Sequence, residues 1–156
     1  MILRYVWASA VCVVFYSSAL ANCVDDHVHL SGPWGSAKFT VEVADTDAER
    51  TQGLMFRDNL AKFESMLFVY DNPQHVAFWM KNTLIPLDIL YFTAEGVLLD
   101  IRENAVPGDL VPFRSSELVQ YVLEVNAGTS KSLKFGLDTV LGHARLAQKR
   151  KTHGCQ

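Results

Sequence analysis

The stretch MLFVYDNPQHVAFWMKNTLIPLDILYF, residues 66–92, determines the fold expected for this chain. Its segments MLFVY, HVAFWMKN and LDILYF are rich in aromatic and aliphatic residues, which predicts three strands. DNPQ separates the first two segments and has the Asp, Asn and Pro content of a turn. We take DNPQ and TLIP as four-residue hairpin loops, so that the three strands form an antiparallel meander.

This register explains why so apolar a stretch keeps a Lys and an Asp. With four-residue loops, Lys81 lies directly across from Asp88 on one neighbouring strand and from Glu64 on the other. Trp79, two residues earlier, points to the same face. Opposed side chains on one face have Cβ atoms about 5 Å apart, so the sequence predicts a cluster of Lys81 with carboxylates. Such a pair would bind a ligand, act in catalysis or only fix the strand register, and a one-residue slip would separate its members.

The remaining mature chain adds further strands and short helices. Residues 37–44 alternate apolar and polar side chains, which predicts a strand. Thr46 and Glu49 form a capping-box pattern at the start of a predicted helix, residues 47–54. Further predicted elements are strands at 97–104 and 120–126, a brief helix within 127–136, and a last strand within 138–147. The predicted fold class is therefore α+β, mainly β: a compact antiparallel, barrel-like sheet with one or two short helices.

The N-terminal residues predict export. Arg4 precedes a mostly apolar run, and small residues at 19–21 suit a signal peptidase. We therefore predict a signal peptide at 1–21 and a periplasmic or secreted mature protein without a stable membrane span. A retained anchor and a lipoprotein attached at Cys23 are the alternatives. The predicted organisation is a lead-in segment at 22–37, a single globular domain at 38–147 and a tail at 148–156.

Cysteine content and charge restrict the function. After signal cleavage Cys23 and Cys155 remain, and in an oxidising compartment they are candidates for a disulfide between the chain ends; two separate thiols are the alternative. The formal net charge is −3, which argues against a nucleic-acid binder. His27 and His29 near Cys23 lack further ligands at metal-site spacing. We predict no metal and no cofactor.

Three motifs identify a family resemblance. AERTQGLMFRDNL at 48–60, the stretch at 66–92 and VLEVNAG at 122–128 resemble the domain of unknown function 192 family over about residues 38–147. The resemblance implies a compact, often exported domain rich in β structure, and it supplies no established activity. Ser65 departs from the Gly that is usual before MLF in the family. In this sequence the motif residues of the family are Glu49, Arg50, Gly53, Leu54, Met55, Arg57, Phe78, Trp79, Met80, Lys81, Asn82, Thr83, Pro86, Asp88 and Glu124.

The leading functional hypothesis is a binding module for a small polar or anionic ligand, such as a carbohydrate-derived one. If the helix end packs over the sheet, Arg57, Lys81 and Asn82 converge, and Arg would bind a carboxylate or phosphate in a forked geometry. Surface pairing of Arg50 and Arg57 with Asp47 and Asp58 is the competing interpretation. The candidate ligand-binding residues are Arg57, Trp79, Lys81, Asn82, Asp88 and Glu124.

Two other functions remain open. A hydrolase or lyase would use Lys81 as nucleophile or base with Asp88 or Glu124, or Asp88 and Glu124 as an acid/base pair. No GxSxG, HExxH or Gly-rich phosphate motif supports catalysis, so whether the protein is an enzyme is left undecided. An envelope accessory module that binds another, unknown protein is the third hypothesis.

Overall fold

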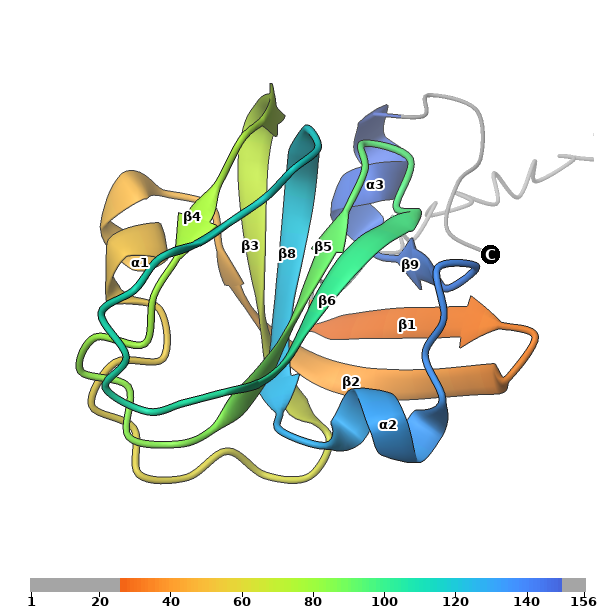
Figure 1. Ribbon diagram of the computed structural model, residues 1–156. Helices are drawn as coiled ribbons and strands as arrows, with labels where there is room; N and C mark the ends of the chain where they lie inside the picture. The colour runs from red at the N-terminus through yellow and green to blue at the C-terminus, as the bar shows by residue number, and fades with distance from the viewer. Residues whose placement is uncertain (1–25, 150–156) are drawn as a thin grey trace, which may run out of the picture.

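A curled sheet with short helices makes up the part of the chain that the computed structural model describes, residues 26–149 (Figure 1). Its strands are β1 (His27–Gly32), β2 (Gly35–Ala44), β3 (Glu64–Gln74), β5 (Leu87–Phe92), β6 (Leu98–Ala105), β8 (Val119–Asn126) and β9 (Val140–Gly142). They are ordered β6-β5-β8-β3-β2-β1-β9, and β4 (Ala77–Phe78) and β7 (Phe113–Arg114) form a separate pair. The predicted class, α+β and mainly β, is confirmed. None of the helices in these residues is long and apolar enough to cross a lipid bilayer.

The sheet contains one parallel pair of neighbouring strands. Thr40 of β2 pairs with Glu64 of β3 in parallel register, whereas the other named strand pairs run antiparallel. The parallel pair arises because the chain returns between β2 and β3 through helix α1 (Asp47–Gln52). The capping box predicted at Thr46 and Glu49 is present at its start. Two more short helices, α2 (Thr129–Leu133) and α3 (Ala144–Lys149), give three in the described residues rather than one or two. The last strand predicted in 138–147 is right only for β9, because the residues that follow form α3.

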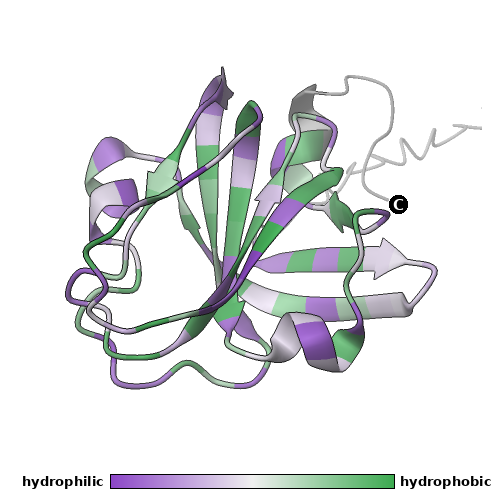
Figure 2. Ribbon diagram, viewed as in Figure 1, coloured by the Kyte–Doolittle hydropathy of each residue, from purple (hydrophilic) through white to green (hydrophobic). Residues whose placement is uncertain are grey.

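The two faces of the sheet bury different side chains. On β8, Leu123 and Val125 belong to a core that also holds residues of the β1–β2 hairpin, and we call this side the hairpin face. Val122 points to the opposite side, where Leu54 and Phe78 pack on the sheet; we call it the α1 face. Figure 2 shows the alternation of apolar and polar residues along the strands. This period of two places neighbouring residues of a strand on opposite faces.

The segment expected to lead into the domain is part of the sheet from residue 27 onward, so its predicted end at residue 37 was wrong. β1 pairs with β2 on one side and β9 on the other. Val28 and Leu30 are fully buried, and His29 between them is exposed. The segment looked like a polar lead-in because only its alternate residues are apolar. The predicted signal peptide and the candidate disulfide residues Cys23 and Cys155 lie outside the described residues.

The predicted hairpin at DNPQ was also wrong. β3 continues through this sequence to Gln74 and pairs with β8, with an irregular register between Val69 and Gln74. Pro73 has no backbone N–H for the ladder, so it accompanies an irregularity in the strand rather than a reversal. The chain then crosses to a different partner, because Ala77 and Phe78 pair with β7.

Candidate functional site

Asp88 is a structural residue on the hairpin face. It is fully buried and pairs with Val125. Its carboxylate accepts hydrogen bonds from the backbone N–H groups of Asn104 (3.0 Å), Gly128 (3.2 Å) and Ser130 (2.9 Å). A buried carboxylate is tolerated when several N–H groups bond it. Asp88 therefore joins β5 to the end of β6 and to the start of α2.

Lys81 does not lie beside Asp88, and the predicted cluster does not form. Lys81 is exposed in a turn, where its ammonium lies 5.2 Å from the centroid of the Trp79 ring. Asn82, next to it, has a φ of 57° and accepts a hydrogen bond from the backbone N–H of Phe56 (2.8 Å). The prediction failed because residues 79–86 form an irregular loop rather than the end of one strand, a tight turn and the start of another.

The Arg57 guanidinium bonds a residue outside the candidate set. Both of its Nη groups donate to the Glu42 carboxylate on β2, and this bonding lowers the pKa of Glu42 below its usual range. An exposed pair of this kind contributes up to about 1 kcal/mol. The surface-pair interpretation therefore holds for Arg57, with Glu42 rather than Asp58 as its partner, and it holds for Arg50, which pairs with Asp47.

The exposed position of Lys81 yields a first prediction. Replacing Lys81 with methionine should change the free energy of unfolding by less than about 0.5 kcal/mol, because the side chain contacts one partly exposed ring in a solvated turn. Urea denaturation of the two proteins measures this difference. A loss of more than about 2 kcal/mol would mean that Lys81 has a buried partner after all.

Glu124 occupies the opposite face of the sheet from Asp88. Glu124 pairs with Ile89 on β5, one residue from the pair of Asp88 with Val125. Because directly paired residues share a face and successive residues alternate, the two carboxyl groups point to opposite sides. They cannot work as an acid/base pair, and the Lys81–Asp88 pair is absent too. Asp88 therefore forms neither of the two pairs predicted for it, with Lys81 or with Glu124.

Glu124 lines a pocket on the α1 face of the sheet. The pocket has a volume of about 360 Å³ and is lined by α1 and the turn after it, by β3 and β4, and by Glu124 itself. Gly53, which ends α1 with a φ of 48°, lets this turn approach the ring of Phe68, since an added Cβ would lie 3.3 Å from Cζ. The apolar and aromatic lining residues include Leu54, Phe68, Tyr70, Phe78 and Trp79.

The Glu124 carboxyl has no hydrogen-bond partner within residues 26–149. Glu124 is 5 % exposed, and burial raises the pKa of its carboxyl group to about 8. A buried carboxyl without a partner favours its neutral form. At neutral pH it is therefore mostly protonated, and it can both donate and accept a hydrogen bond.

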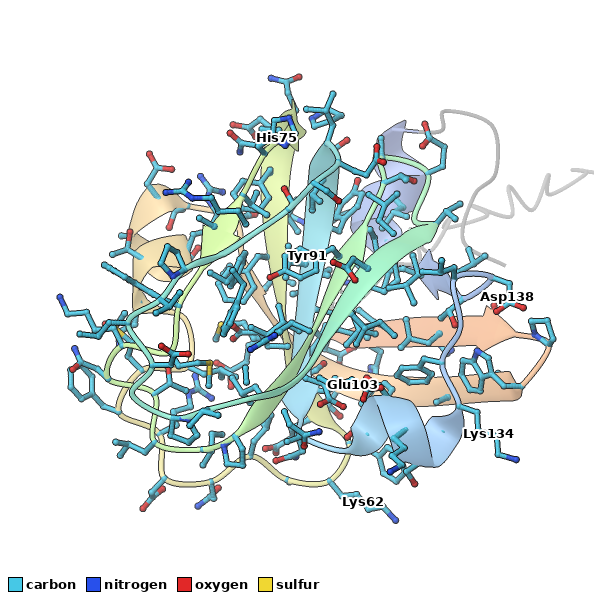
Figure 3. The ribbon with its side chains drawn as sticks, viewed as in Figure 1. Lys62, His75, Tyr91, Glu103, Lys134 and Asp138 are labelled. Atoms are coloured by element: carbon cyan, nitrogen blue, oxygen red, sulfur yellow. The ribbon has the colours of Figure 1, made fainter. Side chains whose placement is uncertain are left out.

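Two tyrosines lie on the same face as Glu124. Tyr91 follows Ile89 by two residues on β5, and Figure 3 shows it over the inner part of the sheet. Burial is the main cause that raises the pKa of both phenols, for Tyr70 to about 12 and for Tyr91 above its ordinary range, and Glu124 adds to both shifts. Both phenols stay protonated at neutral pH. The Tyr91 hydroxyl is buried and lacks a hydrogen-bond partner among the described residues.

Arg50 is the basic residue of the pocket lining, and its guanidinium is already engaged. Nη1 donates to the backbone oxygens of Asp45 (2.6 Å) and Val69 (2.8 Å), and Nη2 pairs with Asp47. The guanidinium also lies 5.2 Å from the centroid of the Tyr70 ring. Arg50 therefore fastens α1 to the sheet and compensates Asp47, and this leaves Glu124 as the lining carboxyl without a counter-ion.

Sequence reasoning found two of the pocket residues and missed the rest. Glu124 and Trp79 were candidates, and both line the pocket. Phe68, Tyr70 and Phe78 were read as ordinary strand residues, because their approach to α1 depends on chain segments that are distant in sequence. Glu124 became a candidate through the family motif, and its place inside the otherwise apolar segment VLEV is the local signal that could have pointed to this site.

Comparison with known proteins gives a family and a fold. Residues 30–142 match the DUF192 family, described as "Uncharacterized ACR". A crystal structure of a protein of unknown function from Novosphingobium aromaticivorans DSM 12444 is 36% identical, with a TM-score of 0.73, over 74% of this chain and 83% of that one. A protein from Sinorhizobium meliloti 1021, described as a "putative transcription regulator", is 41% identical, with a TM-score of 0.74, over 76% and 92% of the two chains. No protein of curated function matches the chain.

Proposed function

The chain belongs to the DUF192 family, whose description supplies no activity, and from its pocket we propose that the protein binds a small polar molecule. The observation that carries the proposal is the Glu124 carboxyl, which is buried, lacks a hydrogen-bond partner in residues 26–149 and lines a cavity. Such a group destabilises a fold unless something pairs with it. Apolar walls with one convergent polar group are typical of small-molecule sites.

The charge of the lining favours a ligand with hydrogen-bond donors over an anionic one. An anion would need the cations that the sequence suggested, but Arg57 pairs with Glu42 and Lys81 lies outside the lining. Glu124 would also repel an anion once ionised. Hydroxyl and amine groups, including those of carbohydrate-derived molecules, would instead donate to its oxygens.

The size and rim of the pocket agree with a small ligand. A volume of about 360 Å³ lies at the lower end of the range of small-molecule sites. Trp79 lines the pocket and is 47 % exposed, so its indole can cover the apolar side of a bound molecule. We keep export as part of the proposal, on the strength of the signal-like residues 1–21.

Thermal unfolding with a ligand panel tests the binding function. The panel contains monosaccharides, polyols, primary and quaternary amines, carboxylates and phosphates. We expect compounds with donor groups to raise Tm, since a ligand at 100 times its Kd stabilises the protein by about 2.7 kcal/mol. The shift should disappear in Glu124→Leu, which removes the polar group and keeps an apolar side chain of similar length.

The exposed substitution Glu103→Gln is the control and should preserve every shift, because Glu103 lies on the solvent-exposed part of β6. Two results would refute the proposal. One is the absence of a shift with all compound classes. The other is a set of shifts that Glu124→Leu leaves unchanged.

A further inference from the structure

We infer that the pocket selects an organic cation, whose ammonium group seats against the Glu124 carboxylate between aromatic side chains. This inference rests on the proposed binding function and narrows its ligand class. It follows from two independent features of the lining, the unbalanced carboxyl and the aromatic walls.

Among residues 26–149, the charges around the pocket leave the Glu124 carboxyl without a counter-ion for its ionised form. The charged lining residues are Asp47, Arg50 and Glu124. Arg50 pairs with Asp47, and no ion pair reaches Glu124 within the described residues. A monovalent cation would balance the ionised Glu124, and it would be the counter-ion that a buried carboxylate needs.

The aromatic lining suits the same ligand. Ring faces attract cations, and quaternary ammonium groups are recognised by aromatic cages. The protein shows this attraction at two of the lining rings, because Arg50 lies 5.2 Å from the Tyr70 centroid and Lys81 lies 5.2 Å from the Trp79 centroid. The other two rings, Phe68 and Phe78, meet edge to face at 4.9 Å, and no cation of the described chain lies over either.

Binding of a cation would release a proton. The neutral Glu124 carboxyl loses its proton to solvent, and the carboxylate that remains pairs with the ammonium group. The titratable and charged groups on this face come from three strands and α1: Tyr70 of β3, Tyr91 of β5, Asp100 and Arg102 of β6, and Asp47 and Arg50 of α1. Burial keeps both phenols protonated near neutral pH, so Glu124 changes its charge there while Tyr70 and Tyr91 do not. Affinity for the cation should rise with pH until Glu124 is ionised without ligand, at about pH 8.

Calorimetry with a matched pair of probes tests the inference on the mature protein. Choline is the cationic probe, and 3,3-dimethylbutan-1-ol is its neutral carbon isostere. We expect choline to bind and its affinity to rise up to roughly tenfold per pH unit below the pKa of Glu124. Near neutral pH, heats measured in buffers of different ionisation enthalpy should show release of about one proton per choline bound. Glu124→Gln should abolish both the pH dependence and the proton release, whereas Glu103→Gln should keep them.

The possible outcomes separate this inference from the binding function itself. If the neutral isostere binds as tightly as choline, or if affinity falls with rising pH, the ligand is a neutral polar molecule; the cation inference is then wrong and the binding function stands. Binding of carboxylates or phosphates in preference to amines would overturn the inference as well. If choline, ethanolammonium, the isostere and the whole thermal panel fail to bind, both proposals are wrong.

Discussion

Replacing Asp88 with alanine lowers the free energy of unfolding by roughly 3–5 kcal/mol, which is the largest loss we expect from a single substitution. The carboxylate is the acceptor for the N–H groups of Asn104, Gly128 and Ser130. Each buried donor left without a partner costs about 1–3 kcal/mol. We expect less than the sum of these costs for the three N–H groups, because water will enter part of the site and accept hydrogen bonds from some of them.

Two further variants make this result specific. One oxygen of Asp88 accepts from Asn104 and Gly128, and the other accepts from Ser130. Asp88→Asn keeps one acceptor oxygen, so its loss in the free energy of unfolding should be roughly half that of Asp88→Ala. Asp58→Ala removes an exposed carboxylate and should stay within about 0.5 kcal/mol of the native chain. Urea denaturation measures all three, and an Asp88→Ala protein within about 1 kcal/mol of the native one would contradict the bonding described.

The second large effect concerns the pH dependence of stability. Replacing Glu124 with glutamine should remove the loss of folding stability that the ionisation of Glu124 causes as pH rises. Its folded pKa of about 8 lies above its ordinary value of 4.5, so the folded protein retains a proton that the unfolded chain releases. The stabilising contribution is complete below pH 4.5 and is lost as pH rises through about 8. The slope is about 1.4 kcal/mol per pH unit at most, so the native protein should lose on the order of 3–5 kcal/mol from this group across that window.

Glu124→Gln should flatten this dependence, because glutamine has the shape of the protonated acid and does not ionise. At about pH 9 the variant should be more stable than the native protein by several kcal/mol, and near pH 5 the two should be similar. Denaturation at a series of pH values measures the difference, with Glu103→Gln as the matched exposed control. Parallel stability curves for the native protein and Glu124→Gln would show that the carboxyl is solvated or paired.

Local sequence features predicted most elements of the fold. The alternation in residues 37–44 gives β2, the Thr46–Glu49 capping box gives α1, and VLLDIREN and QYVLEVN give β6 and β8. Each of these signals acts within one strand or one helical turn, where side-chain period and backbone hydrogen bonding are set by neighbouring residues. At Ser65, by contrast, the side-chain hydroxyl donates to the Thr40 carbonyl on the adjacent strand at 3.0 Å, a contact that no local signal predicts.

Strand partners were much harder to predict. DNPQ has turn composition, yet β3 runs through it: after a register shift Gln74 still pairs with Val119 of β8, and the Gln120 side chain bonds the backbone oxygen of Asp71. Because the hairpin predicted at DNPQ was wrong, the predicted register of Lys81 was wrong as well. The predicted cluster of Lys81 with Asp88 followed from that register and does not exist. The assumed length of a hairpin loop determines the face of the sheet to which every later side chain points. One wrongly predicted turn therefore misplaces the whole candidate site.

By itself, the sequence determined the class of the fold, the main strands and the family to which the chain belongs. It also marked Asp88, as a carboxylate in an apolar stretch, and Glu124, as a motif residue that the family resemblance supplied. Only the tertiary structure decided what each does: Asp88 meets backbone N–H groups on the hairpin face, and Glu124 meets an open pocket on the α1 face. The physical reason is that the partners of a buried charge come from segments distant in sequence, and the sheet register that brings those segments together is not encoded near the charge.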